Sequence, residues 1–298
     1  MDVDRIIAVT GATGRQGGAV ARHLLAGGWR VRALTRKPDS EPARGLAALG
    51  AEIVAVDMMN ADSLAPAFKD AHGVFSVQNP MISGLAAEVR QGRNVADVAK
   101  AAGVRHLVYG SAGTGVPGTG VGSWESKVAV EEHLRSLELP VTVLRPNAFM
   151  ELMTDKAFYP SVSTWHVMPK LMGADRPVTW ICVDDLGAIA AKVFGAPDLY
   201  VGQELKLASD LRSIAECREI WRTATGHAPR RFPMPVWMFE RFVGTDLTTM
   251  WRWLRHSDVP VDPADTYRLL PTASTVEQWL TRRQTAERGD RPGHPSHT

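Results

Sequence analysis

The feature that most constrains this chain is a set of three regularly spaced glycines near its start. Gly11, Gly14 and Gly17 follow a short apolar, β-branched segment at residues 6–10 and open a segment of helical spacing at residues 16–26. Glycine lets a chain turn sharply and lets backbone N–H groups approach a phosphate, while the start of a helix supplies further unpaired donors. In this strand–turn–helix context the glycines predict a dinucleotide pyrophosphate site, with a merely tight turn as the alternative.

The first half of the chain alternates strand and helix patterns. Apolar, β-branched runs predict strands at residues 6–10, 31–35, 53–56, 74–77, 106–109 and 141–144. Helical spacing predicts helices at residues 16–26, before Gly50, and at residues 63–68, 85–102 and 126–137. Strands separated by such helices form βαβ units around a parallel sheet that is covered on both faces. We therefore expect an α/β fold, a doubly wound parallel Rossmann sheet with right-handed crossovers.

The alternation loosens after residue 146. Further strands are predicted at residues 180–183 and 205–208, and helices at residues 184–194, 213–225, 236–242, 247–254 and 276–283. Asp184 and Asp185 are expected to cap the first of these helices. No linker rich in Pro, Gly or Ser divides the chain. We expect an NAD(P)-binding domain at residues 1–150, a smaller, interwoven C-terminal α/β lobe for a substrate or partner at residues 151–284, and a disordered tail at residues 285–298.

Composition excludes several classes of function. Lys plus Arg number 34 and Asp plus Glu number 32, and a net charge of +2 provides no long-range attraction for nucleic acid or an anionic membrane. The two cysteines, Cys182 and Cys217, provide neither a disulfide framework nor a zinc site, and the histidines lack the spacing of metal ligands. The first apolar run is too short for a signal peptide or a membrane span. We expect a cytoplasmic protein without a metal and leave a homodimer open.

The end of the second predicted strand bears on the choice of nucleotide. An acidic residue there would accept hydrogen bonds from the ribose hydroxyls of NAD and repel the 2′-phosphate of NADP. The chain has Arg36 and Lys37 instead, which offer charge-assisted hydrogen bonds to a phosphate. These two residues predict a preference for NADP(H) over NAD(H). Asp39 and Glu41 lie a few residues further on and leave ribose binding by a carboxylate as the alternative.

Four further segments complete a recognisable series. Residues 74–78 read Val-Phe-Ser-Val-Gln, residues 108–111 read Val-Tyr-Gly-Ser, and residues 144–151 read Leu-Arg-Pro-Asn-Ala-Phe-Met-Glu. Between the last two, Glu-Ser-Lys at residues 125–127 precedes Val-Glu-Glu-His-Leu at residues 130–134. With the glycine turn, this series resembles the NmrA-like family of atypical short-chain dehydrogenases from residue 5 to about residue 195. Known relatives include NADP(H)-responsive redox sensors, a transcriptional regulator that binds nucleotide, and reductases of quinones and of phenolic double bonds.

The resemblance implies a role for each matching residue. The pyrophosphate would be bound by Gly11, Thr13, Gly14, Arg15, Gln16 and Gly17, and the 2′-phosphate by Arg36 and Lys37. Asp57 and Met58 would flank the adenine, with a strand-end cap as the alternative for Asp57. Val77, Gln78 and Asn79 would lie beneath the adenine ribose. Lys127 would hydrogen-bond the nicotinamide ribose, and the nicotinamide side would be lined by Pro146, Asn147 and Phe149.

The catalytic residues are where the chain departs from ordinary short-chain dehydrogenases. Those enzymes use a Tyr four residues before the Lys as the proton donor. Here that position is Ser123, whose hydroxyl is far too weak an acid. Either Lys127 is itself the acid–base group, with a pKa lowered by burial and by an apolar pocket, or it only anchors the ribose. Ser111 is a candidate for a substrate-polarising hydroxyl, with a turn serine as the alternative, and Tyr109 is close enough in sequence to point toward the site.

Two functions follow from these residues. The first is an oxidoreductase that reduces a small apolar conjugated carbonyl or quinone-type substrate by hydride transfer from NADPH. The second is a non-catalytic NADP(H) redox sensor that regulates a protein partner. Seven of the nine Trp residues follow residue 150, which suits an aromatic cap over a planar substrate, although most of them are expected in the ordinary core. The glycine-rich residues 110–122 either close over a substrate or are disordered.

Overall fold

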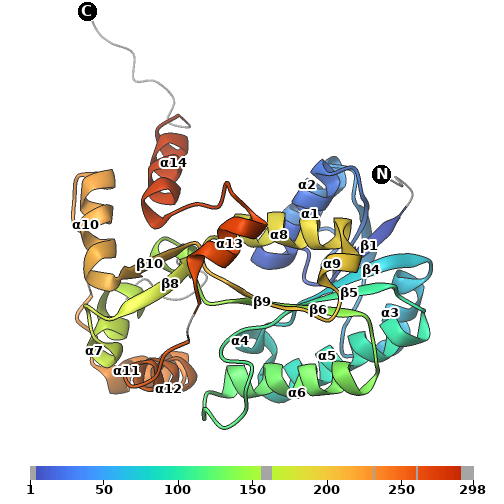
Figure 1. Ribbon diagram of the computed structural model, residues 1–298, viewed down its shortest axis with the longest axis horizontal. Coiled ribbons are helices and arrows are strands. Elements are labelled where there is room, and N and C mark those ends of the chain that lie inside the picture. Colours follow the sequence, from blue (N-terminus) through green and yellow to red (C-terminus); the bar gives the residue numbers. More distant parts are fainter. Residues whose placement is uncertain (1–4, 156–162, 231, 260, 290–298) are drawn as a thin grey trace, which may run out of the picture.

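The computed structural model describes residues 5–155, 163–230, 232–259 and 261–289. Within these residues, one seven-stranded sheet has the order β3-β2-β1-β4-β5-β6-β9, and every neighbouring pair is parallel (Figure 1). The strands are β1 (Ile6–Val9), β2 (Arg30–Thr35), β3 (Glu52–Ala55), β4 (Ala71–Ser76), β5 (His106–Gly110), β6 (Val141–Pro146) and β9 (Glu204–Leu207). The strand order reverses between β1 and β4, which confirms the predicted doubly wound α/β fold.

Helices cover both faces of this sheet (Figure 1). One face carries α1 (Arg15–Ala26), α2 (Glu41–Ala48) and α8 (Val183–Gly195), and the other carries α3 (Ala61–Phe68), α5 (Leu85–Ala101) and α6 (Gly122–Ser136). Successive strand residues point to opposite faces: Val108 joins the core beneath α1 and α8, whereas Leu107 and Tyr109 join the core beneath α5. Because both faces are covered, the central strands β1 and β5 are buried at every residue.

A second, smaller region is built around a sheet of its own. Its three-stranded sheet has β8 (Pro177–Ile181) between the antiparallel β10 (Asp210–Ser213) and the parallel β7 (Ala148–Phe149). Around it lie η1 (Met150–Met153), η2 (Ser163–Val167), α7 (Met168–Met172), α10 (Ile214–Thr225), α11 (Val236–Val243), α12 (Asp246–Leu254) and α14 (Val276–Gly289). The core of this region includes Trp165, Trp180, Phe239 and Trp251. Short helices α4 (Pro80–Ser83), α9 (Pro197–Tyr200) and α13 (Pro263–Leu269) complete the described elements.

The chain passes between the two regions more than once. After β7 and β8 it returns to the main sheet, where α8 packs along α1 and β9 becomes the edge strand beside β6. The close approach of α8 and α1 needs Gly187, because an added Cβ there would lie 2.8 Å from the backbone of Ala19. Residues after position 150 therefore contribute to both regions.

Several boundaries differ from the sequence predictions. Helix α14 continues to Gly289, so residues 285–289 are helical, and the rest of the expected disordered tail lies outside the described residues. Helix α8 is capped by the sulfur of Cys182, which accepts from the N–H of Asp185, so the expected capping by Asp184 and Asp185 is wrong. In the described part of the chain, no helix is both long and apolar enough to cross a membrane.

Candidate functional site

A cavity of about 1300 Å³ lies at the carboxyl ends of the main-sheet strands, where the smaller region meets them. Residues that follow β1, β2, β3 and β4 line one end, and residues of α6, α7, β8 and α12 line the other. In open α/β sheets, ligands bind outside the carboxyl ends of the strands at the point where strand order reverses. The cavity occupies this position, between β1 and β4.

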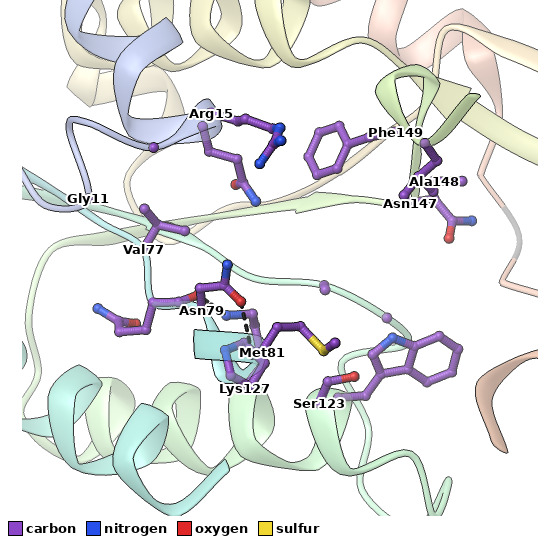
Figure 2. Close-up of a pocket in the computed structure, with 18 of the residues that line it drawn as sticks. Gly11, Arg15, Val77, Asn79, Met81, Ser123, Lys127, Asn147, Ala148 and Phe149 are labelled. Carbon is purple, nitrogen blue, oxygen red and sulfur yellow. Dashed lines mark hydrogen bonds between the residues drawn. The ribbon is translucent and has the colours of Figure 1, made fainter. Parts of the chain in front are cut away.

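The glycine turn forms one wall of the cavity (Figure 2). Gly11 has a φ of +58°, and an added Cβ at Gly17 would lie 2.4 Å from the carbonyl oxygen of Gly11, so these positions need glycine. Gly14 is the N-cap of α1, which has neither a capping side chain nor an acidic residue in its first turn. The buried Oε1 atom of Gln16 also has no hydrogen-bond partner among the described residues. This uncapped helix start fits a pyrophosphate.

Neighbouring side chains tie the turn to its surroundings. The hydroxyl of Thr13 is 3.1 Å from that of Thr35, at the end of β2. Arg15 forms an ion pair with Asp155, which follows η1, and its side chain extends toward Phe149 (Figure 2). Asp155 does not itself line the cavity, but it pairs with a side chain that does.

Two basic side chains line the cavity after β2. Arg36 and Lys37 are exposed, and neither has an ion-pair partner in the described part of the chain. Asp39 and Glu41, the alternative ribose ligands, do not line the cavity. The only charges that β2 and its following turn present to the cavity are thus positive, within the described residues.

The next strand ends combine cavity lining with local hydrogen bonds. Asp57 Oδ1 accepts from the N–H of Met59 at 2.9 Å, so this carboxylate caps its turn and also faces the cavity. Met58 and Val77 also line the cavity. Gln78 donates to Ser76 at 3.0 Å, and its buried Oε1 has no partner among the described residues. Asn79 caps α4 by accepting from the N–H of Met81 at 2.9 Å.

Lys127 lies across the cavity from Arg15 and Phe149 (Figure 2). Its ammonium donates to Oε1 of Glu88 at 2.6 Å and to the carbonyl of Gln78 at 3.3 Å. An ammonium has three N–H groups and the described residues provide these two hydrogen-bond acceptors, so one N–H is without an acceptor among them; the ring of Tyr109 also lies 5.7 Å from Nζ. The surroundings differ from the apolar pocket expected for Lys127, because the side chain is paired with a buried carboxylate.

Three candidates lie outside the cavity lining. Ser111 donates to Glu131 and accepts from Arg145 Nη1 at 3.0 Å, so its hydroxyl serves a buried network rather than the cavity. Tyr109 is fully buried, and burial raises the pKa of its phenol well above the ordinary value, which makes it unfit as a proton donor. Pro146 ends β6 in the core; its neighbours Asn147 and Phe149 do line the cavity. Ala112 and Gly113 occupy the place expected for Ser111, because the chain turns immediately after β5.

The glycine-rich segment between β5 and α6 is held by hydrogen bonds. Glu125 accepts from the N–H of Thr119 at 2.7 Å and from its hydroxyl at 2.8 Å, and the hydroxyl bond is the largest cause that lowers the pKa of this carboxyl. Gly113 packs on the ring of Trp124, where an added Cβ would lie 2.4 Å away. Arg145 donates to the carbonyl of Ala112 at 2.9 Å. These contacts hold the segment in one position, in which Ala112 and Gly113 form part of the cavity wall.

The far end of the cavity is predominantly apolar. Its lining residues come from five elements far apart in sequence, and include Met81, Ile82, Trp124, Met168, Met172, Val178, Leu247, Met250, Trp251 and Leu254. Of the seven Trp residues after position 150, Trp251 alone lines the cavity among the described residues, while Trp165 and Trp180 are core and Trp237 is exposed. The expected aromatic cap is therefore largely a wall of flexible methionines.

Polar groups interrupt this apolar wall at several points, including the ion pair of Arg176 with Asp258 at 2.7 Å. Asp246, the first residue of α12, accepts from the N–H of Ser123 at 3.0 Å and so joins α12 to the start of α6. Asn147 donates to the hydroxyl of Thr179. Helix α6 begins at Gly122, four residues before the predicted start, so Ser123 and Lys127 lie one helical turn apart. Within the described residues, no three His, Cys, Asp or Glu side chains form a group that could hold a metal ion.

Glu88 and Asp246 are the site residues that sequence reasoning missed. A signal for Glu88 was present: Glu88, Gln91, Val95 and Ala99 repeat at helical spacing on the buried face of α5, and an acidic residue in such a stripe needs a buried partner. No local signal marks Asp246, because the first turn of any helix favours an acidic residue.

Comparisons with known proteins place this geometry in context. The sequence model of the NmrA-like family matches residues 3–280. The chain is 32% identical over 259 residues to an NmrA-like family domain-containing oxidoreductase, FrzB, of Cladobotryum sp, which spans 78% of this chain and 77% of that protein.

Solved structures share the fold. NmrA, a negative transcriptional regulator, in complex with NADP has a TM-score of 0.77 at 20% identity, over 96% of this chain and 97% of that chain, and NmrA has also been solved with NAD. An NADPH-dependent quinone oxidoreductase of Escherichia coli has a TM-score of 0.73 at 19% identity, over 93% and 99% of the two chains. At these identities the likeness establishes the fold.

Proposed function

This chain belongs to the NmrA-like family, and we propose that it reduces a small, apolar, conjugated carbonyl or quinone-type compound at the expense of NADPH. The observation that supports this best is the position of Lys127. Its ammonium, with one N–H left for a ligand, lies where a cavity end suited to a dinucleotide meets an apolar end. The oxidoreductase relative and the quinone oxidoreductase of the same fold support the same class of reaction.

The preference for NADP(H) rests on this chain's own residues, since NmrA is known with both nucleotides. Arg36 and Lys37 line the cavity at the end of β2 with no ion-pair partner among the described residues, and a 2′-phosphate would give them one. The turn at Gly11, Gly14 and Gly17 would hold the pyrophosphate. Val77 and Asn79 would lie along the adenosine part, beside Asp57.

In this proposal Lys127 takes the role of proton donor that the Tyr has in ordinary short-chain dehydrogenases. NADPH bound here would supply a hydride, and a conjugated acceptor that takes it would develop negative charge on its oxygen. An ammonium at that oxygen stabilises the charge and can donate the proton, whereas the hydroxyl of Ser123 is too weak an acid to do so. Methionine and leucine side chains such as Met250 and Leu254 exclude water from the acceptor and suit a planar apolar compound.

Single-turnover oxidation of NADPH at saturating nucleotide tests this proposal, with a naphthoquinone, an enone and a simple ketone as acceptors. Lys127→Met should lower the rate with the best acceptor by about 10²–10⁴-fold, the usual effect of a general acid–base group. The matched control is Lys100→Met, at an exposed position on α5. A rate unchanged in Lys127→Met removes the amine from the chemistry. Tight NADPH binding by the wild type without oxidation by any acceptor supports a redox sensor instead.

A further inference from the structure

Helix α6 carries two acid–base pairs that are almost completely buried. Lys127 pairs with Glu88 of α5 at 2.6 Å, with exposed side-chain fractions of 8% and 0%. One turn further along α6, Glu131 pairs with Arg145 of β6 at 2.9 Å, with 1% exposed on each side. Each carboxylate also accepts from a serine hydroxyl, Ser126 for Glu88 and Ser111 for Glu131.

The two pairs differ in what they face. Neither Glu131 nor Arg145 lines the cavity, and their network supports the chain after β5 from behind. Glu88 is equally hidden, but its partner Lys127 lines the cavity. A buried charge is costly unless it is paired, so Glu88 and Lys127 depend on each other, whereas Glu131 also pairs with Arg135 and Arg145 with Glu204. The first pair therefore fixes a group that can reach a ligand, whereas the second pair fixes only the fold.

We propose that Glu88 is a positioning residue of the site, which acts through Lys127 and is itself oriented by Ser126. The proposal rests on the proposed role of Lys127. A lysine side chain is flexible, with a point charge that any nearby acceptor can attract. The Glu88 carboxylate and the carbonyl of Gln78 confine the ammonium to one place at the end of β4, with its remaining N–H available to a ligand. The hydroxyl of Ser126 occupies the other carboxylate oxygen of Glu88 at 2.5 Å, so the acid cannot turn away from the lysine.

A double-mutant cycle distinguishes positioning from plain structural support. Glu88→Gln keeps the shape of the side chain and removes its charge. In the wild-type background it should lower the single-turnover rate at saturating NADPH by about 10–100-fold and weaken NADPH binding several-fold. In the Lys127→Met background it should change neither quantity, because the group that Glu88 positions is gone. Glu88 effects that persist at full size in the Lys127→Met background overturn the proposal.

Two further variants keep the test decisive. Glu131→Gln breaks the matched pair on the same helix and should lower the melting temperature while it leaves the rate and NADPH affinity of the folded protein near wild type. Ser126→Ala retains the Glu88 carboxylate, so it serves if Glu88→Gln does not fold. It should lower the rate about 3–10-fold in the wild-type background and leave it unchanged with Lys127→Met. An equal loss of rate in Glu131→Gln, or no loss in Ser126→Ala and Glu88→Gln, contradicts positioning.

The readouts also separate this proposal from the proposed function. If none of the tested acceptors is reduced by NADPH in the presence of the wild-type protein, the reductase assignment fails. The double-mutant cycle can then still be measured through NADPH affinity. Coupling between Glu88 and Lys127 in that affinity then still supports positioning, and its absence refutes it. The affinities are measured by fluorescence titration of the full chain.

Discussion

The two ends of the cavity are built in different ways. The end proposed to bind the dinucleotide is formed by one turn, residues 10–17, with side chains at the ends of successive strands. The apolar end consists of side chains from α4, α6, α7, β8 and α12, which lie up to about 170 residues apart in the chain. A site formed by backbone needs a local sequence motif, whereas a site formed by packed side chains needs only that each element present a suitable residue there. Lys127 lies where the two ends meet.

The largest effect should follow from a change in the backbone-built end. Gly14→Val places a branched side chain at the start of α1, where even a Cβ would lie 3.1 Å from the carbonyl of Gly11. We expect a folded protein whose affinity for both NADPH and NADH falls more than about 100-fold, since the phosphate cannot approach the N–H groups. Calorimetric titration measures both affinities. The control is Gly45→Val, at an exposed position of α2 with open space around it, and near-normal binding by Gly14→Val would show that the turn does not hold the nucleotide.

A smaller and selective effect should follow from the charged side chains of the same end. Arg36→Ala should weaken NADPH binding by about 10–150-fold, which corresponds to about 1.5–3 kcal/mol for a hydrogen bond to a charged group, and leave NADH nearly unchanged. Fluorescence titration with the two nucleotides gives the ratio directly. Arg30→Ala, at the opposite end of β2, is the matched control. Equal losses of affinity for both nucleotides would show that Arg36 does not bind the 2′-phosphate.

The contact of Glu151 with the start of α8, which joins the smaller region to the main sheet, should make the stability of the protein depend on pH. Glu151, in η1, is partly buried and accepts from the N–H of Val183 at the start of α8, and burial raises the pKa of its carboxyl to about 7. Its unfolded pKa is near 4.5, so between these values the folded state holds a proton that the unfolded state has lost. Stability should therefore fall as pH rises from about 4.5 to 7, by on the order of 2 kcal/mol.

Glu151→Gln tests this pH dependence. The amide keeps an acceptor for Val183 and cannot ionise, so the variant should lose this part of the pH dependence and gain stability relative to wild type above pH 7. Urea unfolding at pH 5 and pH 8 for both proteins measures the change. A wild type that is equally stable at both pH values, with the variant parallel to it, would exclude Glu151 as the source.

The smallest effect should come from the side-chain-built end, because many residues share its surface. Met250→Ala removes one flexible side chain from the apolar wall and should raise KM for an apolar acceptor about 5-fold, near 1 kcal/mol of lost contact, with NADPH affinity unchanged. Steady-state kinetics at saturating NADPH separates KM from kcat. Met238→Ala, on α11 outside the cavity lining, is the control. A loss of NADPH affinity in Met250→Ala would mean that the two ends are not separate.

The correspondence between prediction and structure follows the same division. The periodicity of the first half identified six strands of the main sheet and the helices between them, because each strand has an apolar, β-branched run and most of the helices have one buried stripe. The elements β7, β10 and α13 were missed, since their sequences, Ala-Phe, Asp-Leu-Arg-Ser and Pro-Ala-Asp-Thr-Tyr-Arg-Leu, show neither an apolar run nor a clear helical stripe. The seventh strand, β9, was predicted as a strand, but its place beside β6 depends on a return of the chain that no local pattern indicates.

The sequence by itself determined the glycine turn, the basic end of β2 and the absence of a Tyr four residues before Lys127, because these depend on residue identity at fixed spacing along one βαβ unit. Only the tertiary structure decided which of the remaining candidates reach the cavity. Ser111 and Tyr109 are close to the site in sequence yet are buried outside the cavity lining, whereas Glu88 and Asp246 are distant in sequence yet contact the helix that carries Lys127. The direction of a side chain at the end of a strand, and the partner of a buried charge, are set by the elements that pack around it, and those contacts exist only once the chain has folded.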